Sequence, residues 1–113
     1  MAEPEYTFNP IQARKELQIG DFYFKKGRYR AAAGRYDRAS KWQPGLAEAY
    51  YKLGVARERT NETQQALDAY RKYLAAAPSS RRAPEVKKKI TDLQRKPPKP
   101  DERPDPRPTA SPP

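Results

Sequence analysis

The sequence of 113 residues predicts an all-α fold, an α-solenoid of two helical hairpins closed by one further helix. Two adjacent segments of equal length, 13–46 and 47–80, align with each other without an insertion or a deletion. Apolar residues recur at helical spacing in five segments. Glycine and proline residues interrupt the chain between these segments, at points where such residues end helices. The chain length favours a single domain, which we place at residues 10–95.

The internal repeat has an offset of 34 residues. The aligned pairs are Ala13 with Ala47, Ile19 with Leu53, Gly20 with Gly54, Ala32 with Ala66, Tyr36 with Tyr70 and Pro44 with Pro78. A repeat of this size cannot bury its apolar face alone, so neighbouring repeats stack. The alignment therefore predicts two equal hairpins that pack side by side.

The first hairpin is predicted from residues 10–26 and 29–41. Asn9 followed by Pro10 is typical of a helix start, with an N-cap and a proline at the first helical position. Gly27 is suited to the left-handed turn that ends the first helix. The second helix places Ala32, Ala33, Tyr36 and Ala39 on one side, and it ends at Gln43-Pro44-Gly45.

The second hairpin is predicted from residues 46–59 and 62–76, joined by a turn at Thr60 and Asn61. The residues expected to face inward are Ala49, Tyr50, Leu53 and Ala56, then Ala66, Leu67, Ala69, Tyr70, Tyr73 and Leu74. A fifth helix at 83–95 carries Ala83, Val86, Ile90 and Leu93 on one stripe and charged residues on the other side. Such a helix can cover the open apolar end of a solenoid.

The two ends of the chain are expected to lie outside this domain. Residues 1–9 are predicted to form an extended segment. Residues 96–113 contain eight prolines and no aromatic or large aliphatic residue, so they are expected to form a disordered tail of polyproline-II character. An alternative for Lys96–Pro100 is a docking motif for a proline-recognising domain.

The composition argues against an enzyme. The chain has no cysteine and no histidine, and no nucleophile–base pair, metal-ligand set or glycine-rich phosphate loop is visible. We expect no catalytic residue, no metal and no cofactor. The carboxylates Glu16 and Asp21, and Glu58 and Glu62, are expected to be intrahelical salt-bridge partners.

The sequence also shows no apolar run long enough to cross a membrane and no secretory signal. The compartment stays open, and the sequence as written fits the cytoplasm. The alternative is the periplasm or cell envelope, if a signal has been removed.

The repeated residues resemble the tetratricopeptide repeat family over about residues 10–95. That family has a small residue at position 8 of each unit, alanine at 20, an aromatic residue at 24 and proline at 32. These positions hold Gly20 and Gly54, Ala32 and Ala66, Tyr36 and Tyr70, and Pro44 and Pro78. The family usually has a small residue at position 27 and often an aromatic one at position 11. The first unit follows this pattern with Ala39 and Tyr23. The second unit departs from it with Tyr73 and Arg57, which fits a terminal repeat. The resemblance implies a protein-binding scaffold.

A narrower resemblance covers Asn9–Pro10 and Gly20–Ala32. It is to the repeat region of the bacterial outer-membrane assembly lipoproteins, which are periplasmic scaffolds for insertion of β-barrel proteins. This chain is shorter than those proteins and lacks their signal and lipid-bearing cysteine.

The tetratricopeptide resemblance implies a concave groove lined by the first helix of each hairpin. The residues placed there are Arg14, Leu17, Asp21, Phe24 and Lys25, then Glu48, Tyr51, Val55, Glu58 and Arg59. The fifth helix could extend the groove with Arg82, Glu85 and Lys89. This mixture of apolar and charged residues suits a peptide or protein segment. The alternative is that Leu17, Phe24 and Val55 are buried under their neighbours. A clamp for a C-terminal carboxylate is not expected, because Asp21 would repel it.

The formal charge of +10 suggests a rival function. A basic patch is formed by Arg28, Arg30, Arg35, Arg38, Lys41, Lys87, Lys88 and Lys89. Such a patch can contact nucleic acid or an anionic membrane surface. Nucleic acid is disfavoured because the neighbouring aromatics fall at core positions of the repeat, and membrane contact would be peripheral. A monomer is favoured over a homodimer in which Tyr6 and Phe8 help to cover the first helix.

Overall fold

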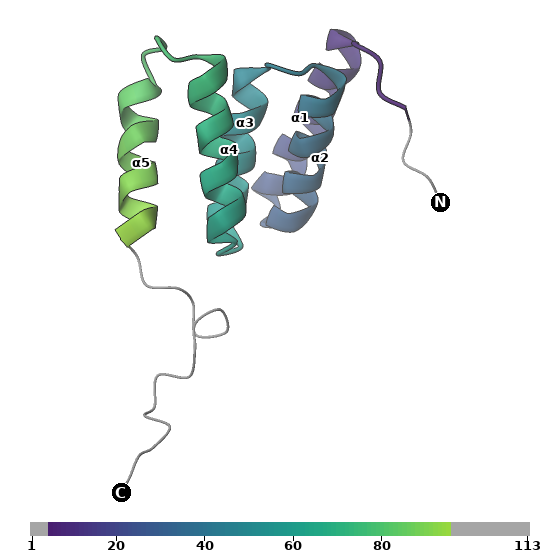
Figure 1. Cartoon of the computed structure of the whole chain (residues 1–113). Coiled ribbons are helices and arrows are strands. Elements are labelled where there is room, and N and C mark those ends of the chain that lie inside the picture. Colours follow the sequence, from purple (N-terminus) through teal and green to yellow (C-terminus); the bar gives the residue numbers. More distant parts are fainter. Residues whose placement is uncertain (1–4, 96–113) are drawn as a thin grey trace, which may run out of the picture.

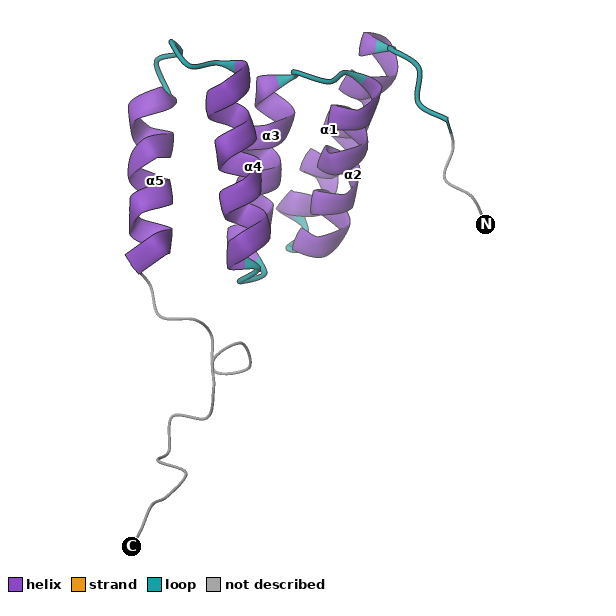
Figure 2. Cartoon of the chain, in the orientation of Figure 1, coloured by secondary structure: helices purple, strands orange, loops and turns teal. Residues whose placement is uncertain are grey.

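The structure, a computed structural model, describes residues 5–95, and this part of the chain folds into five α-helices without a strand (Figures 1 and 2). The helices are α1 (Pro10–Lys25), α2 (Tyr29–Trp42), α3 (Ala47–Arg59), α4 (Thr63–Ala76) and α5 (Ala83–Arg95). Each predicted helix is confirmed to within one residue at either end. The tail predicted at 96–113 lies outside the described residues, and the domain boundaries stay a prediction.

The helices follow one another in a row, as a solenoid requires. The main contacts join α1 to α2, α2 to α3, α3 to α4 and α4 to α5, so each helix packs on the next one along the chain (Figure 1). Helices α1 and α2 form the first hairpin, and α3 and α4 form the second. In an arrangement where each unit touches only its neighbours, stability is approximately the sum of the unit terms and the interface terms.

The same repeat position turns the chain in both hairpins. Gly27 after α1 has φ of +77°, and Asn61 after α3, which is 34 residues later, has φ of +61°. Glycine adopts this left-handed conformation without a steric penalty, and asparagine tolerates it better than most residues. At the start of α1, the Asn9 side chain accepts a hydrogen bond of 3.0 Å from the backbone N–H of Gln12.

A tyrosine ring packed on a glycine holds each hairpin together. A Cβ atom placed on Gly20 would lie 2.5 Å from the ring of Tyr36, and one placed on Gly54 would lie 2.4 Å from the ring of Tyr70. Both tyrosines are buried, with 2% and 0% of their surface exposed. The two helices of a hairpin therefore approach each other more closely than any side chain at the glycine position would allow.

The core runs through both hairpins and ends under α5. Alanines from α1 to α4, with Leu17, Tyr36 and Leu53, form one buried cluster. A second cluster joins Leu67, Tyr70 and Tyr73 of α4 to Val86 and Leu93 of α5. Val86 is fully buried, so α5 covers the open face of the second hairpin as predicted. Between residues 5 and 95, no helix is both long and apolar enough to span a bilayer.

The close contact of Gly54 with Tyr70 makes a prediction about stability. Gly54→Ala should lower the free energy of unfolding by about 1–3 kcal/mol, because the added methyl group displaces a buried ring. Gly34→Ala is the matched control: Gly34 is also helical but has no atom within 4 Å of the new Cβ. That variant should gain up to about 1 kcal/mol from helix propensity. Urea unfolding followed by circular dichroism measures both, and equal effects would contradict the packing argument.

Candidate functional site

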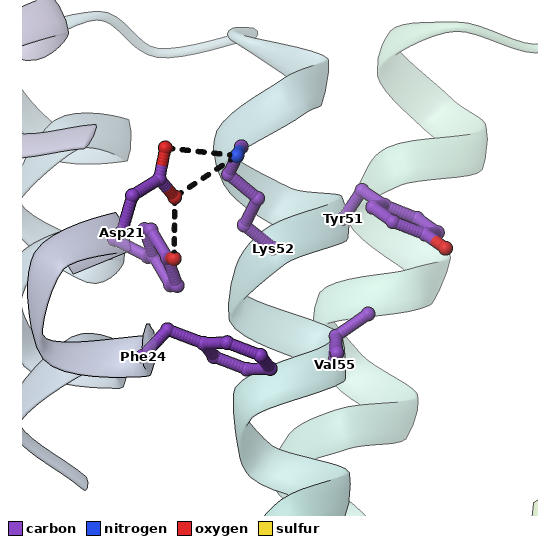
Figure 3. A pocket seen from close by; sticks show the side chains of 6 residues that line it. Asp21, Phe24, Tyr51, Lys52 and Val55 are labelled. Carbon is purple, nitrogen blue, oxygen red and sulfur yellow. Dashed lines mark hydrogen bonds and ion pairs between the residues drawn. The ribbon is translucent and has the colours of Figure 1, made fainter. Parts of the chain in front are cut away.

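A hollow of about 150 Å³ opens between α1 and α3. Its lining residues are Asp21, Phe24, Tyr36, Tyr51, Lys52 and Val55. Figure 3 shows the Phe24 ring extending from α1 toward α3, which carries Val55, with the ion pair of Asp21 and Lys52 nearby. Four of the residues predicted for the groove, Asp21, Phe24, Tyr51 and Val55, are thus brought together. We call this place the α1–α3 hollow.

The polar side of the hollow is a cluster of three groups from three helices. The Tyr36 hydroxyl donates to Asp21 Oδ1 at 2.6 Å. Lys52 Nζ lies 2.9 Å from Oδ1 and 3.2 Å from Oδ2 of the same carboxylate (Figure 3). Lys52 also lies 5.9 Å from the centre of the Tyr36 ring. Both charges are therefore satisfied within the protein, and they join α1 and α2 to α3.

The second hairpin repeats this arrangement with different residues. The Tyr70 hydroxyl donates to Glu58, and Lys89 Nζ of α5 lies 3.4 Å from Glu58 Oε2. Lys89 also lies 5.8 Å from the centre of the Tyr70 ring. Each hairpin thus has a buried tyrosine, a carboxylate on its first helix, and a lysine from the helix that follows the hairpin. We call these two clusters the groove triads.

Burial and the adjacent carboxylates change the acidity of both tyrosines in the triads. Desolvation, followed by the hydrogen bond to Asp21, raises the pKa of Tyr36 above its ordinary value. Desolvation and then the hydrogen bond to Glu58 do the same to the pKa of Tyr70. Both phenols stay protonated and remain donors throughout the neutral range.

An arginine makes a cation–π contact with an aromatic ring on each side of the hollow. The Arg82 guanidinium lies 3.9 Å from the centre of the Tyr51 ring, whose hydroxyl donates to Glu85 at 2.8 Å. Arg59 lies 5.6 Å from the centre of the Phe24 ring. Arg82 and Glu85 were predicted to extend the wall of the groove, and the structure places them against Tyr51. These contacts hold the rings in place before any ligand arrives.

The remaining predicted groove residues differ in their access to solvent. Leu17 has 7% of its surface exposed and belongs to the core, so it offers almost no surface to a ligand. Glu58 is half-buried within its triad, whereas Arg14, Lys25, Glu48 and Arg59 are exposed. Lys52 lines the hollow but was not among the predicted groove residues. The sequence does contain one indication of this role. Lys52 is a cation on the first helix of the second repeat, the helix that pairs with Asp21 of the first repeat.

The expectation of intrahelical salt bridges for the four carboxylates was wrong. Asp21 pairs with Lys52 of α3, and Glu58 pairs with Lys89 of α5. Glu16, which is 4% exposed, pairs with Arg35 of α2 at 3.1 Å. Glu62 precedes α4 and pairs with Arg57 of α3 at 2.9 Å. Each of the four carboxylates thus pairs with a cation that another helix supplies, which spacing along a single helix does not predict.

The predicted basic patch divides into two clusters at opposite ends of the helix row (Figure 1). Four of its eight cations take part in ion pairs: Arg35 with Glu16, Lys41 with Asp37, Lys88 with Asp92 and Lys89 with Glu58. Arg28 and Arg38 line a hollow on the outer side of the first hairpin. Arg30 and Lys87 are exposed on the surface. The patch is therefore not one continuous surface.

No group of three or more potential metal-ligating side chains occurs within residues 5–95. The same residues provide a scaffold of helices with paired charges and one apolar hollow between the first helices of the two hairpins.

The comparison with protein families identifies the architecture. The sequence model of the tetratricopeptide repeat matches residues 17–81, which is more than half of the chain. The chain therefore belongs to the tetratricopeptide repeat family, whose repeats generally act as non-catalytic modules for protein interaction. A search of curated proteins found no match. The narrower resemblance to outer-membrane assembly lipoproteins remains a prediction.

The raised pKa of the triad tyrosines predicts how stability depends on alkaline pH. Unfolded tyrosines ionise near pH 10, whereas Tyr36 in the folded chain stays protonated to higher pH. The stabilisation that the Tyr36 hydroxyl gives to the folded chain is therefore complete below about pH 10, and it is lost as the pH rises above that value. Tyr36→Phe should reduce the slope of the unfolding free energy against pH between about pH 10 and 12, by up to ~1.4 kcal/mol per pH unit.

Urea unfolding at a series of alkaline pH values measures this slope. Tyr70→Phe provides an independent repeat of the test, because the pKa of Tyr70 is raised by the same causes. Slopes that match the wild type in both variants would contradict the assignment of the two hydroxyls as buried donors.

Proposed function

We propose that this chain binds a segment of another protein along the face formed by α1, α3 and α5, with one apolar side chain of the ligand in the α1–α3 hollow. The observation that carries the proposal is an open, largely apolar hollow between the two repeats, which Phe24 of α1 and Val55 of α3 both line (Figure 3). The family supplies the general role, and the hollow supplies a specific place for contact.

The size and lining of the hollow support an apolar anchor. Apolar cavities of about 150 Å³ hold a group the size of benzene. Most of the wall is carbon from Phe24, Tyr51 and Val55, and its charged groups, Asp21 and Lys52, already satisfy each other. A ligand side chain entering the hollow would therefore gain from removal of apolar surface from water, without having to break the ion pair.

The groups around the hollow support an ordered ligand. Glu48, Arg59 and Glu85 are exposed charged residues of α3 and α5 near the hollow. Flanking charges of both signs chiefly set orientation and specificity, whereas buried apolar anchors supply most of the affinity. The ordered rings of Phe24 and Tyr51 lose little side-chain entropy on binding.

A test can begin from peptides selected on the wild-type chain with a random peptide library. Val55→Phe fills the hollow with a larger apolar side chain, and its affinity for the selected peptides should fall by about tenfold or more, as expected for loss of a central anchor. Isothermal titration calorimetry measures the affinity. Lys87→Ala is the control, because Lys87 is exposed on α5 and does not line the hollow.

Circular dichroism would verify that Val55→Phe keeps its helices. A selected peptide that bound this folded variant as tightly as the wild type would show that the hollow is not the anchor. A library that yielded no binding peptide would count against the proposal as a whole.

A further inference from the structure

One side of the second hairpin is buried against the first hairpin. Among the described residues, the equivalent side of the first hairpin has no preceding hairpin against it. In the second hairpin, Ala49, Leu53, Ala56 and Ala69 are buried, with at most 9% of their surface exposed, and they pack in one cluster with residues of α1 and α2. The residues at the same repeat positions in the first hairpin are Lys15, Ile19, Phe22 and Arg35. We call the face that they form the N-terminal edge.

Large apolar side chains are exposed on this edge. Phe22 is 57% exposed, Ile19 36% and Ile11 72%, all on α1. With Phe8, they are the exposed large hydrophobic residues found in the described part of the chain. Apolar residues gathered on one helix face are typical of an interaction surface, in contrast to single ones scattered over a protein.

The described N-terminal segment does not cover the edge near Phe22. The Asn9 N–H donates to the Trp42 carbonyl oxygen at 2.9 Å, and the rings of Tyr6 and Trp42 lie 4.8 Å apart. These contacts hold residues 6–9 beside the end of α2. Phe22 lies at the other end of the hairpin, close to the turn between α1 and α2.

The edge contains a hollow that has a counterpart one repeat later. Its lining residues are Tyr23, Arg28, Ala31, Gly34, Arg35 and Arg38, around a volume of about 320 Å³. The counterpart, of about 160 Å³, is lined at five equivalent positions by Arg57, Gln65, Asp68, Ala69 and Lys72, together with Leu53 and Asp37. Asp37 belongs to α2, the helix packed against α3. A helix of the preceding unit thus contributes a carboxylate beside Arg57 and Lys72.

The hollow of the first hairpin contains three arginines and no carboxylate. Arg38 takes the place of Lys72, and Tyr23 takes the place of Arg57. Gly34 takes the place of Asp68, and Arg35 takes the place of Ala69. A neighbouring hollow, which shares Tyr23 and Arg28, adds Phe22 and Lys26. None of the residues lining these two hollows is acidic, and Glu16, the partner of Arg35, is only 4% exposed. The N-terminal edge is therefore apolar and cationic.

We propose that the N-terminal edge docks an amphipathic helix of another protein, one with acidic residues beside its apolar stripe. The helix lies against α1 as α2 lies against α3, and one of its carboxylates takes the place that Asp37 has in the second hairpin. This site lies on a different face from the α1–α3 hollow and goes beyond the groove function.

A second copy of the chain fits this edge poorly. The face of α2 that could supply Asp37 is already packed on α3. The opposite end of the molecule exposes Lys87, Lys88 and Arg95 on α5. Glu85 and Asp92 are also exposed on α5, but Lys88 pairs with Asp92 and cations remain in excess on this helix, so it complements the cationic edge poorly. An acidic partner gains from the same charges.

The test uses two synthetic helical peptides of about 18 residues, long enough to form a marginal helix. Both carry leucine at helical spacing, and they differ only in glutamate or lysine on the flanks. Fluorescence anisotropy at about 0.15 M ionic strength compares their binding to the full chain. The glutamate peptide should bind at least about tenfold more tightly than the lysine peptide.

Four variants distinguish binding at the edge from general attraction to a basic protein and from binding in the groove. Phe22→Ala and Arg38→Glu should each weaken binding of the glutamate peptide by about tenfold. Lys87→Glu makes the same change of charge as Arg38→Glu on α5, and it should have a much smaller effect. Val55→Phe should leave binding unchanged, so failure of this site and failure of the groove are separable.

Equal binding of both peptides would overturn the proposal, as would equal losses in Arg38→Glu and Lys87→Glu. Analytical ultracentrifugation of the wild type gives a further check. A dimer that Phe22→Ala dissociates would show that a second copy, and not an acidic helix, occupies the edge.

Discussion

The contact of a tyrosine ring with a glycine backbone determines the geometry of this protein. Tyr36 on Gly20 and Tyr70 on Gly54 set the distance between the helices of each hairpin. The same packing carries both hydroxyls to the face of the first helices, where they donate to Asp21 and Glu58. The core contact and the polar contact depend on each other, because a shift of the ring would also remove the tyrosine hydroxyl from its carboxylate.

The groove triads then link successive units. Lys52 and Lys89 each come from the helix that follows a hairpin, so each ion pair crosses an interface of the solenoid. Pairing within the protein leaves the α1–α3 hollow apolar in effect, although two charged residues line it. The N-terminal edge differs in this respect. No acidic residue lines its two hollows, which contain Lys26, Arg28, Arg35 and Arg38. The two faces are therefore suited to ligands of different chemistry.

The sequence predicted the helices almost to the residue, because helical spacing, Asn9, Gly27 and the prolines are local signals. It predicted four residues of the hollow, since repeat positions map directly onto helix faces. It left open whether Leu17 lies in the groove or under its neighbours, and it did not predict that Lys52 completes the site. It also assigned the carboxylates to partners on their own helices, because spacing along one helix says nothing about the distance to the next.

The sequence by itself determined the repeat length and the five helices, since helical spacing and helix-end signals act over short distances. The contact of each glycine with a tyrosine ring was seen only in the packed helices. Only the tertiary structure decided which lysine meets which carboxylate and where open space remains. Both depend on the lateral distance between helices, which the sum of many buried contacts sets. The repeat also shows why equivalent positions differ in exposure: Leu53 has a preceding hairpin to pack against, and Ile19 does not.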